Sequence, residues 1–191
     1  MTSEITDKRI LILNAVEKLV AEEGFEGLSM QKLAKRAGVA AGTIYRYFDD
    51  KTHLLREARL HATAKAADII QAGVSDDLPL KERYRLFWLN IWNYAQTRSA
   101  VQTHLLYEQF VPDDIEQVHQ LEKEMFRKVD RMFDEGKTTG LFKELDNNVL
   151  SGVSLETSTT MARKQRKSCS QLTDDQIEQA IEASWDALIK H

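Results

Sequence analysis

The chain has 191 residues, of which 42% are apolar and 29% charged, a composition typical of folded globular proteins. Its eight Gly and two Pro are too few for an all-β sandwich, and neither an apolar run of the ~18 residues that cross a bilayer nor a signal peptide is found. The net charge of −4 argues against a protein that coats nucleic acid, and the single Cys169 excludes an internal disulfide bond and fits a reducing compartment. We therefore expect an all-α, cytoplasmic protein.

The first fifty residues predict one long helix and two short ones. Residues 8–23 place apolar side chains at helical spacing, and Gly24 suits the left-handed residue that ends a helix. Ser29 can cap the next helix and Gly38 can end it, while a third helix covers about residues 41–47.

The rest of the chain continues this helical pattern. A helix over residues 51–72 follows two aspartates that can cap it, and later helices can be capped by Asp146 and by a capping box that begins at Thr173. Gly136 and Gly140 are expected to break the helical run before Asp146. The remaining apolar stripes lie near residues 84–95, 101–110, 112–132, 146–161 and 173–188. About nine helices and no strand are predicted.

Positive charge is concentrated in one short segment. Residues 28–48 contain Lys32, Lys35, Arg36 and Arg46 and no acidic residue. A local basic patch on an acidic protein indicates a small surface that faces an anion. A solvated helix face is the alternative.

The same segment has the spacing of a helix-turn-helix. Two short helices can pack closely when the first presents a small side chain, which Ala34 supplies, and Gly38 tolerates the positive φ of the turn. Apolar groups stand where a shared core needs them, at Leu33, Ala37, Val39, Ile44 and Phe48. This arrangement is the one that places a second helix in the major groove of DNA.

The second helix would meet the base edges with its first residues. Ala41 and the methyl group of Thr43 can contact a thymine methyl, and the Thr43 hydroxyl can bond to a base or a phosphate. Gly42 allows a close approach to the DNA.

Four further residues are candidates for the DNA backbone. Tyr45, Arg46 and Tyr47 offer donors to phosphate. Lys51 stands in the first turn of a helix, where a cation opposes the helix dipole, and a bound phosphate would satisfy both the lysine and the free N–H groups. Alternatively, Tyr45 packs in the core and Arg46 pairs with a neighbouring aspartate.

This part of the sequence closely resembles the N-terminal domain of TetR-family (tetracycline-repressor-like) regulators over about residues 8–60. The residues that carry the resemblance are Gly24, Phe25, Leu33, Ala34, Ala37, Gly38, Val39, the run from Gly42 to Phe48, Lys51, Leu54 and Leu55. It implies a homodimeric, ligand-responsive transcriptional regulator, usually a repressor, with a DNA-binding domain at 8–50 and a helical effector-binding and dimerisation domain at 51–191. Helix 51–72 would connect them.

The resemblance also assigns DNA contacts to particular positions. They are Ser29, Ala41, Gly42, Thr43, Tyr45, Tyr47 and Lys51, with Arg46 as an addition. The sequence departs from the family pattern at Ala40, which cannot cap the recognition helix through its side chain, and at Ala41, where a polar residue is frequent. The alternative for the whole segment is a structural hairpin with solvated tyrosines and lysines.

The later helices are rich in aromatic residues, which are expected either to form a core or to line an apolar ligand cavity. The candidate ligand-binding residues are Trp88, Trp92, His104, Tyr107 and Phe126. They predict a small-molecule effector whose identity the sequence does not specify.

The last helices combine apolar and small residues in a way typical of a four-helix interface with a second copy. The candidate interface residues are Val153, Thr157, Met161, Ile177, Ile181, Trp185 and Leu188. Packing of the same stripes within one chain is the alternative.

Catalytic and metal-binding patterns are weak. His104 and Glu108 lie one helical turn apart but lack the third and fourth ligands of a compact metal site, and there is no Gly-rich phosphate loop or nucleophile elbow. We therefore predict a double-stranded DNA-binding regulator with no cofactor, metal, membrane contact or enzymatic activity. A ligand-independent regulator or activator, and a small helical enzyme or ligand carrier, are the alternatives.

Overall fold

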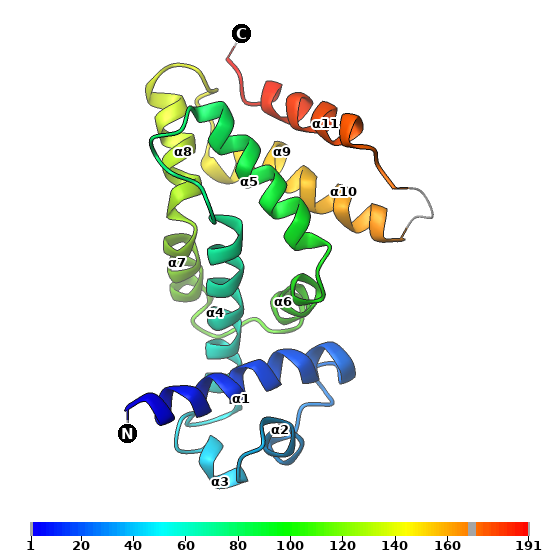
Figure 1. Ribbon diagram of the computed structural model, residues 1–191. Helices are drawn as coiled ribbons and strands as arrows, with labels where there is room; N and C mark the ends of the chain where they lie inside the picture. The colour runs from blue at the N-terminus through cyan, green and yellow to red at the C-terminus, as the bar shows by residue number, and fades with distance from the viewer. Residues whose placement is uncertain (1, 168–170, 191) are drawn as a thin grey trace. The chain divides into compact units, whose positions relative to one another are not determined.

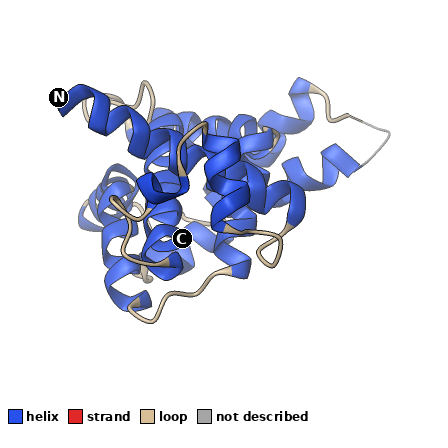
Figure 2. Ribbon diagram, turned by 90° about the horizontal axis from the view of Figure 1, so that it is seen from below, coloured by secondary structure: helices blue, strands red, loops and turns tan. Residues whose placement is uncertain are grey.

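The computed structural model describes residues 2–167 and 171–190, so Cys169 lies outside the described part. The regular secondary structure of these residues is helical, as predicted, apart from one isolated β-bridge (Figure 2). The helices labelled in Figure 1 are α1 (Thr2–Glu23), α2 (Met30–Ala37), α3 (Ala41–Ile44), α4 (Lys51–Ile70), α5 (Leu80–Ala95), α6 (Arg98–Gln109), α7 (Ile115–Met125), α8 (Arg127–Thr138), α9 (Asn147–Val153), α10 (Leu155–Lys167) and α11 (Asp174–Asp186). Over these residues, no helix combines the length and the apolar character that a bilayer crossing demands.

Helix ends follow the predicted capping residues. Ser29 accepts a hydrogen bond from the Lys32 N–H at 3.2 Å, Asp146 accepts one from the Asn148 N–H at 2.8 Å, and Thr173 begins a complete capping box. Each bond satisfies a backbone donor that the first turn of a helix leaves free.

Two predicted helices are each broken into two. Phe126 separates α7 from α8, and Ser154 separates α9 from α10. The Ser154 hydroxyl donates to the Leu150 carbonyl at 2.6 Å, a bond that competes with the regular helical pattern and bends the backbone. The prediction that Gly136 breaks a helix is wrong: it lies inside α8, and the missing side chain leaves room for the Phe142 ring, which a Cβ atom would approach to 2.1 Å.

The chain packs into two compact units, and each unit is built from two separate segments of the sequence. Unit 1 comprises the chain up to Lys65 together with Arg98–Met125. Unit 2 comprises Ala66–Thr97 and the chain from Phe126 onward. The predicted functional division near residue 50 stays a prediction.

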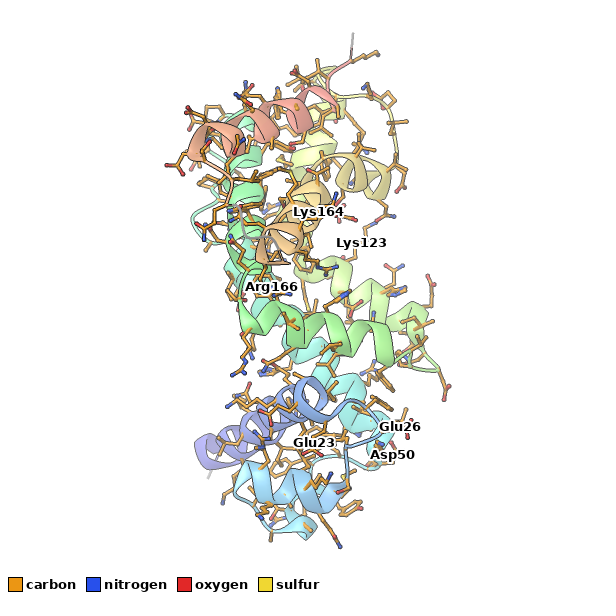
Figure 3. The ribbon with its side chains drawn as sticks, turned by 90° about the vertical axis from the view of Figure 1, so that its right-hand side faces the viewer. Glu23, Glu26, Asp50, Lys123, Lys164 and Arg166 are labelled. Atoms are coloured by element: carbon orange, nitrogen blue, oxygen red, sulfur yellow. The ribbon has the colours of Figure 1, made fainter. Side chains whose placement is uncertain are left out.

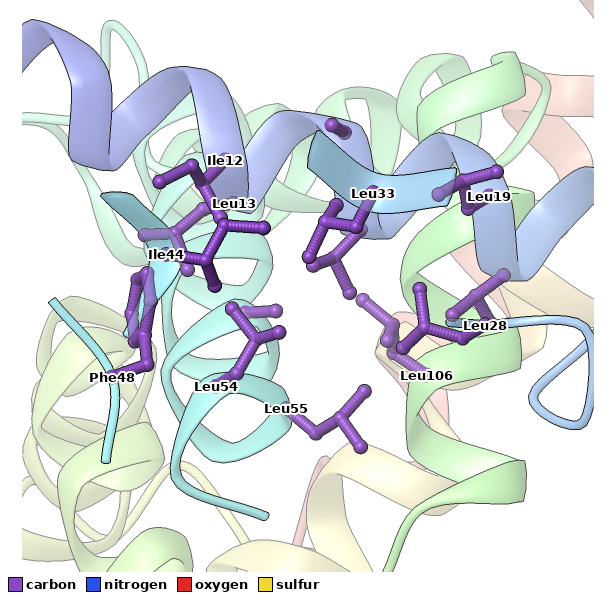
Figure 4. Close-up of a cluster of buried hydrophobic side chains, with 14 of the residues drawn as sticks. Ile12, Leu13, Leu19, Leu28, Leu33, Ile44, Phe48, Leu54, Leu55 and Leu106 are labelled. Carbon is purple, nitrogen blue, oxygen red and sulfur yellow. The ribbon is translucent and has the colours of Figure 1, made fainter. Parts of the chain in front are cut away.

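Unit 1 is built on an apolar core to which α1, α2, α3, α4 and α6 all contribute (Figure 4). Leu33, Ile44 and Phe48 are buried as predicted, and Leu54 and Leu55 of α4 belong to the same cluster. Burying each such side chain stabilises the fold by about 1.5–3 kcal/mol. The two short helices are therefore held by their inward faces.

A buried ion pair links α4 and α7 inside unit 1. The Arg59 guanidinium donates to both carboxylate oxygens of Glu122, at 2.7 and 3.0 Å, and to the Phe110 carbonyl at 3.2 Å. Both side chains are buried, and the Thr63 hydroxyl, which donates to the Arg59 carbonyl at 2.9 Å, lies 3.4 Å from the carboxylate. Such a pair is tolerated in a core because nearly all of its donors and acceptors are bonded.

Unit 2 is organised around α5, which packs against α8, α10 and α11 (Figure 1). Its buried face carries Tyr84, Phe87, Trp88 and Trp92, so the predicted aromatic stripe forms the centre of this core. The Tyr84 hydroxyl donates to Ser184 at 2.7 Å, and burial raises the pKa of Tyr84 to about 12.

We predict that Glu122→Gln lowers the free energy of unfolding by about 3 kcal/mol, because it leaves the buried Arg59 cation without a counter-charge. Urea unfolding measures the loss. Glu178→Gln is the matched control, since Glu178 pairs with Arg85 at the surface, where removing a charge costs about 0.5 kcal/mol or less. Equal losses in the two variants would contradict a structural role for the buried pair.

Candidate nucleic-acid interface

The turn between α2 and α3 has the geometry that the sequence predicts. Gly38 adopts a φ of +68°, and the N–H groups of Gly38 and Val39 donate to Lys35 and Ala34 carbonyls at 3.4 and 3.0 Å. Ala34 is buried where α2 packs on α3. Left-handed glycine and small alanine together let the two helices meet at a tight turn.

The recognition helix is shorter than the predicted residues 41–47. Its regular part ends at Ile44, and the next residues continue with tighter bonds, from the Arg46 N–H to the Thr43 carbonyl at 3.2 Å and from the Tyr47 N–H to the Ile44 carbonyl at 3.0 Å. Ala40 occupies the N-cap position without a side-chain hydrogen bond, as expected for alanine. The segment is anchored through Ile44, which is fully buried.

The start of α3 is open to solvent. Ala41 and Gly42 are exposed and Thr43 is half-buried. A Cβ atom built on Gly42 would meet nothing within 4 Å, so the protein itself leaves space above this residue. The three predicted base-reading positions are thus available to another molecule.

The two tyrosines differ in their surroundings. Tyr45 is 56% exposed, which excludes the alternative that it packs in the core. Tyr47 is half-buried against the core of unit 1, and its ring lies 6.4 Å from that of Phe48. Tyr45 therefore projects from the recognition segment, and Tyr47 is held at its edge.

Half of the predicted basic patch is neutralised by α1, which the sequence pattern did not reveal. Lys32 pairs with Glu23, labelled in Figure 3 at the end of α1, and Arg36 pairs with Glu22. The hydrogen bond from Arg36 lowers the pKa of Glu22. These partners stand nine and fourteen residues away in the chain, outside the reach of local spacing rules.

Arg46 has no ion-pair partner among the described side chains. The two neighbouring aspartates are engaged elsewhere: Asp49 lies 3.3 Å from the His53 ring, and Asp50 accepts the His53 N–H at 2.7 Å as the cap of α4. The predicted alternative of an Arg46–Asp pair is therefore wrong, and an exposed guanidinium stands beside the recognition helix.

Lys51 is the first residue of α4, and that first turn contains no acidic side chain. Its ammonium group lies 4.9 Å from the centroid of the Phe25 ring, and no carboxylate of the described residues pairs with it. A cation–π contact orients the ammonium without neutralising it. Phe25, which sequence analysis used only as part of the resemblance, thus positions the lysine.

The candidate ligand-binding residues fall in both units. Trp88 and Trp92 are buried in unit 2 with their rings stacked at 5.6 Å, and Phe126 is packed against the same core. His104 belongs to α6 of unit 1 and is half-buried, and the side chain of Tyr107 lies outside the described part of the structure.

The candidate dimer residues fall into three groups by exposure. Ile181, Trp185 and Leu188 are buried within their own protomer, where the Trp185 ring lies 5.2 Å from both Tyr84 and Phe142. Val153 on α9 is 45% exposed. The half-buried members are Thr157, Met161 and Ile177.

Comparison with known proteins identifies the family. A family model described as bacterial regulatory proteins of the tetR family matches residues 12–58, and one described as the tetracyclin repressor-like C-terminal domain matches residues 79–189. The chain belongs to the TetR family. It is a transcriptional regulator with a DNA-binding helix-turn-helix.

Individual relatives agree with this assignment. A TetR-family regulator of Vibrio parahaemolyticus is 56% identical, with a TM-score of 0.89 over 96% of this chain and 100% of that one. An HTH-type transcriptional regulator of Haemophilus influenzae is 31% identical over 97% of each chain. The transcriptional repressor KstR of Mycobacterium tuberculosis is 29% identical over 64% of this chain and 58% of that protein.

We predict that Lys51→Gln weakens binding to specific and random DNA alike and reduces the slope of log affinity against log salt by about 0.9, because one phosphate contact is lost. Fluorescence anisotropy at several salt concentrations measures the slope. The control is Lys81→Gln, which removes a surface lysine of α5 that pairs with Glu182. A slope for Lys51→Gln equal to that of the wild type would remove the lysine from the phosphate contacts.

Thr43→Ala is expected to change discrimination among DNA sequences by about 1–3 kcal/mol if its hydroxyl bonds to a base, with little change in the salt slope. Competition between the selected site and single-base variants of it measures the effect. Thr160→Ala, on an exposed position of α10, is the matched control. A uniform loss over all sequences would place the Thr43 hydroxyl on the DNA backbone.

Proposed function

We propose that the protein is a homodimeric repressor that binds a palindromic operator and leaves it when a small molecule binds to unit 2. The observation that carries the proposal is the exposed start of α3, followed in the chain by two cations, Arg46 and Lys51, that no described carboxylate neutralises. A surface of this kind combines groups for base edges with groups for phosphates.

In this proposal, Ala41, Gly42 and Thr43 enter the major groove and read base edges. Tyr45, with its exposed ring, reaches the DNA backbone beside them. The other residues that contact the DNA backbone in this proposal are Ser29, Arg46, Tyr47 and Lys51. Because Ser29 accepts a hydrogen bond as a cap, its hydroxyl proton remains available to a phosphate.

The repressor assignment has support from relatives that are named repressors. KstR of Mycobacterium tuberculosis is named a transcriptional repressor, and its similarity covers 64% of this chain. A repressor blocks transcription by occupying its operator, so release by a ligand requires that the ligand bind the DNA-free conformation more tightly. We place that ligand beside the buried aromatic pair Trp88 and Trp92 of unit 2.

We further assign residues 8–50 to DNA binding and 51–191 to the effector and the dimer, with α4 as the connector. α4 is one continuous helix that begins with the proposed phosphate contact Lys51 and ends at Ile70. Its first part belongs to unit 1, and the part from Ala66 onward belongs to unit 2. A continuous helix is stiff enough to transmit a change at one end to the other.

For the dimer, the exposed apolar side chains point to α9. Val149 and Val153 stand one turn apart on α9 and are both nearly half exposed, and Thr157 and Met161 stand one turn apart on α10, beyond the break at Ser154. We propose that these two pairs meet the second copy, with Ile177 at the margin. Ile181, Trp185 and Leu188 would then support the interface from the protomer core.

The decisive experiment selects DNA from a random library with the purified full-length protein. An enriched inverted repeat, bound by two protomers, is the expected result. Failure to enrich any sequence would overturn the proposal. Specific binding that no compound of a diverse apolar library weakens would instead indicate a ligand-independent regulator.

Val153→Glu is predicted to produce a monomer that binds the operator at least tenfold more weakly, because it places a charge in an apolar interface. Analytical ultracentrifugation measures the assembly state. Leu121→Glu is a matched control, since Leu121 is 44% exposed but lies on α7 of unit 1. If the Val153→Glu protein remains dimeric, the interface lies elsewhere. Trp185→Glu, by contrast, is expected to unfold unit 2, because the Trp185 ring is buried in its core.

A further inference from the structure

Two buried polar atoms of α5 have no hydrogen-bond partner among the described residues, and one of them belongs to the aromatic stripe. Tyr84, Trp88 and Trp92 stand at four-residue intervals on the buried face of α5. The Tyr84 hydroxyl is bonded to Ser184, whereas the Trp88 Nε1–H finds no acceptor among the described residues although the side chain is fully buried.

An unbonded donor in a core is costly. Leaving a buried N–H unsatisfied disfavours the folded state by about 1–3 kcal/mol, and folded proteins pair nearly all such groups. An acceptor from outside the chain would remove this cost. The position of Trp88, beside the stacked Trp92 ring, makes that acceptor part of an aromatic site.

The helix that packs on α5 presents small side chains. Ser154, Ser158 and Ala162 are buried at four-residue intervals at the start of α10 and along it. The hydroxyls of both serines donate to carbonyls of their own turn, at 2.6 Å to Leu150 and at 2.6 Å to Leu155. Both hydroxyl protons are used within the helix, so these serines offer no free donor to a ligand, although their oxygens can still accept.

The buried positive charge of α5 is paired with a carboxylate. The buried cation of α5, Arg83, is bonded to Glu135 of α8 at 2.6 Å, and its Nε also lacks an acceptor. Arg83 precedes Trp88 by five residues, which turns its side chain roughly 140° around the helix from that of Trp88. A carboxylate at Trp88 would therefore not be paired with Arg83, and burying an unpaired carboxylate has a large desolvation cost.

We propose that unit 2 binds an apolar molecule with a neutral oxygen acceptor, such as a ketone or an ester, and that the Trp88 Nε1–H donates to this oxygen. The apolar body lies against Trp92 and the small side chains of α10. This inference rests on the proposed effector function and names the chemical class of the effector.

The test uses three probes of similar size on the full-length protein: acetophenone, ethylbenzene and benzoate. Acetophenone offers a neutral oxygen acceptor, ethylbenzene has no oxygen, and benzoate carries a charged carboxylate. Heteronuclear NMR of isotope-labelled indole nitrogens follows Trp88, Trp92 and Trp185 separately, with assignments from Trp92→Phe and Trp185→Phe. Acetophenone is expected to move the Trp88 indole proton downfield and to bind at least threefold more tightly than ethylbenzene and tenfold more tightly than benzoate.

Trp88→Phe removes the donor and keeps an aromatic ring, so it should abolish the preference for acetophenone over ethylbenzene. Trp185→Phe is the matched control and should keep that preference, because Trp185 packs against Tyr84 and Phe142 and is not part of the proposed contact. If Trp88→Phe does not fold, the indole shifts of the wild-type protein decide alone.

Three outcomes overturn the inference: equal affinity for acetophenone and ethylbenzene, a Trp88 indole that no probe perturbs, or a permanent bond from it to a buried water, seen as a water-to-indole cross-relaxation peak. Operator release is measured with the same probes and with a diverse library, so that failure of this inference can be distinguished from failure of the proposed function. A compound that releases DNA without moving the Trp88 indole signal leaves the effector function standing and removes only Trp88 from it.

Discussion

The burial of the Arg59–Glu122 ion pair is the constraint around which unit 1 is arranged. Two charges have been removed from water, so their positions are strongly specified by the hydrogen bonds that compensate them. Arg59 lies on α4, whose neighbouring Leu55 and Ala58 enter the apolar core. The pair therefore sets how α4 meets α7, and the core formed with α4 sets where α3 is anchored.

The recognition helix illustrates this dependence. α3 is a single turn with no side-chain cap, and so short a helix has little stability of its own. Ile44 and Phe48, both buried against residues of α4, supply the stability that the backbone lacks. The exposed side chains at its start are positioned by this inward face.

Local signals in the sequence predicted much of the fold because their causes are local. Ser29, Gly38 and Asp146 end or begin helices through bonds within a few residues, and all three are where the spacing placed them. No Gly or Pro stands near the break at Phe126, and Gly152 before Ser154 lies inside α9 rather than at the break, so neither break could be predicted from these residue types. Burial of Trp185 depends on Tyr84 and Phe142, which are distant in the chain.

The candidate site was predictable to the same extent. The helix-turn-helix spacing identified which residues stand at the start of α3, since that depends only on the turn. The charge pattern overstated the basic surface, because Glu22 and Glu23 lie before the turn and reach Arg36 and Lys32 only in the folded chain. The role of Phe25 beneath Lys51 likewise required the tertiary structure.

The neutralised half of the basic patch bears on how a regulator finds its site in a chromosome. Every stretch of DNA offers phosphates, so each free cation strengthens binding to all of them equally and lengthens the time lost at irrelevant positions. By pairing Lys32 and Arg36 with α1, the protein lowers this background attraction while the start of α3 is left unchanged. Occupancy of the true site among about 10⁶–10⁹ competitors depends on the ratio of the specific to the non-specific affinity, which a cation that contributes equally to both does not change. The acidic end of α1 therefore shortens each stay at an irrelevant position without lowering that ratio.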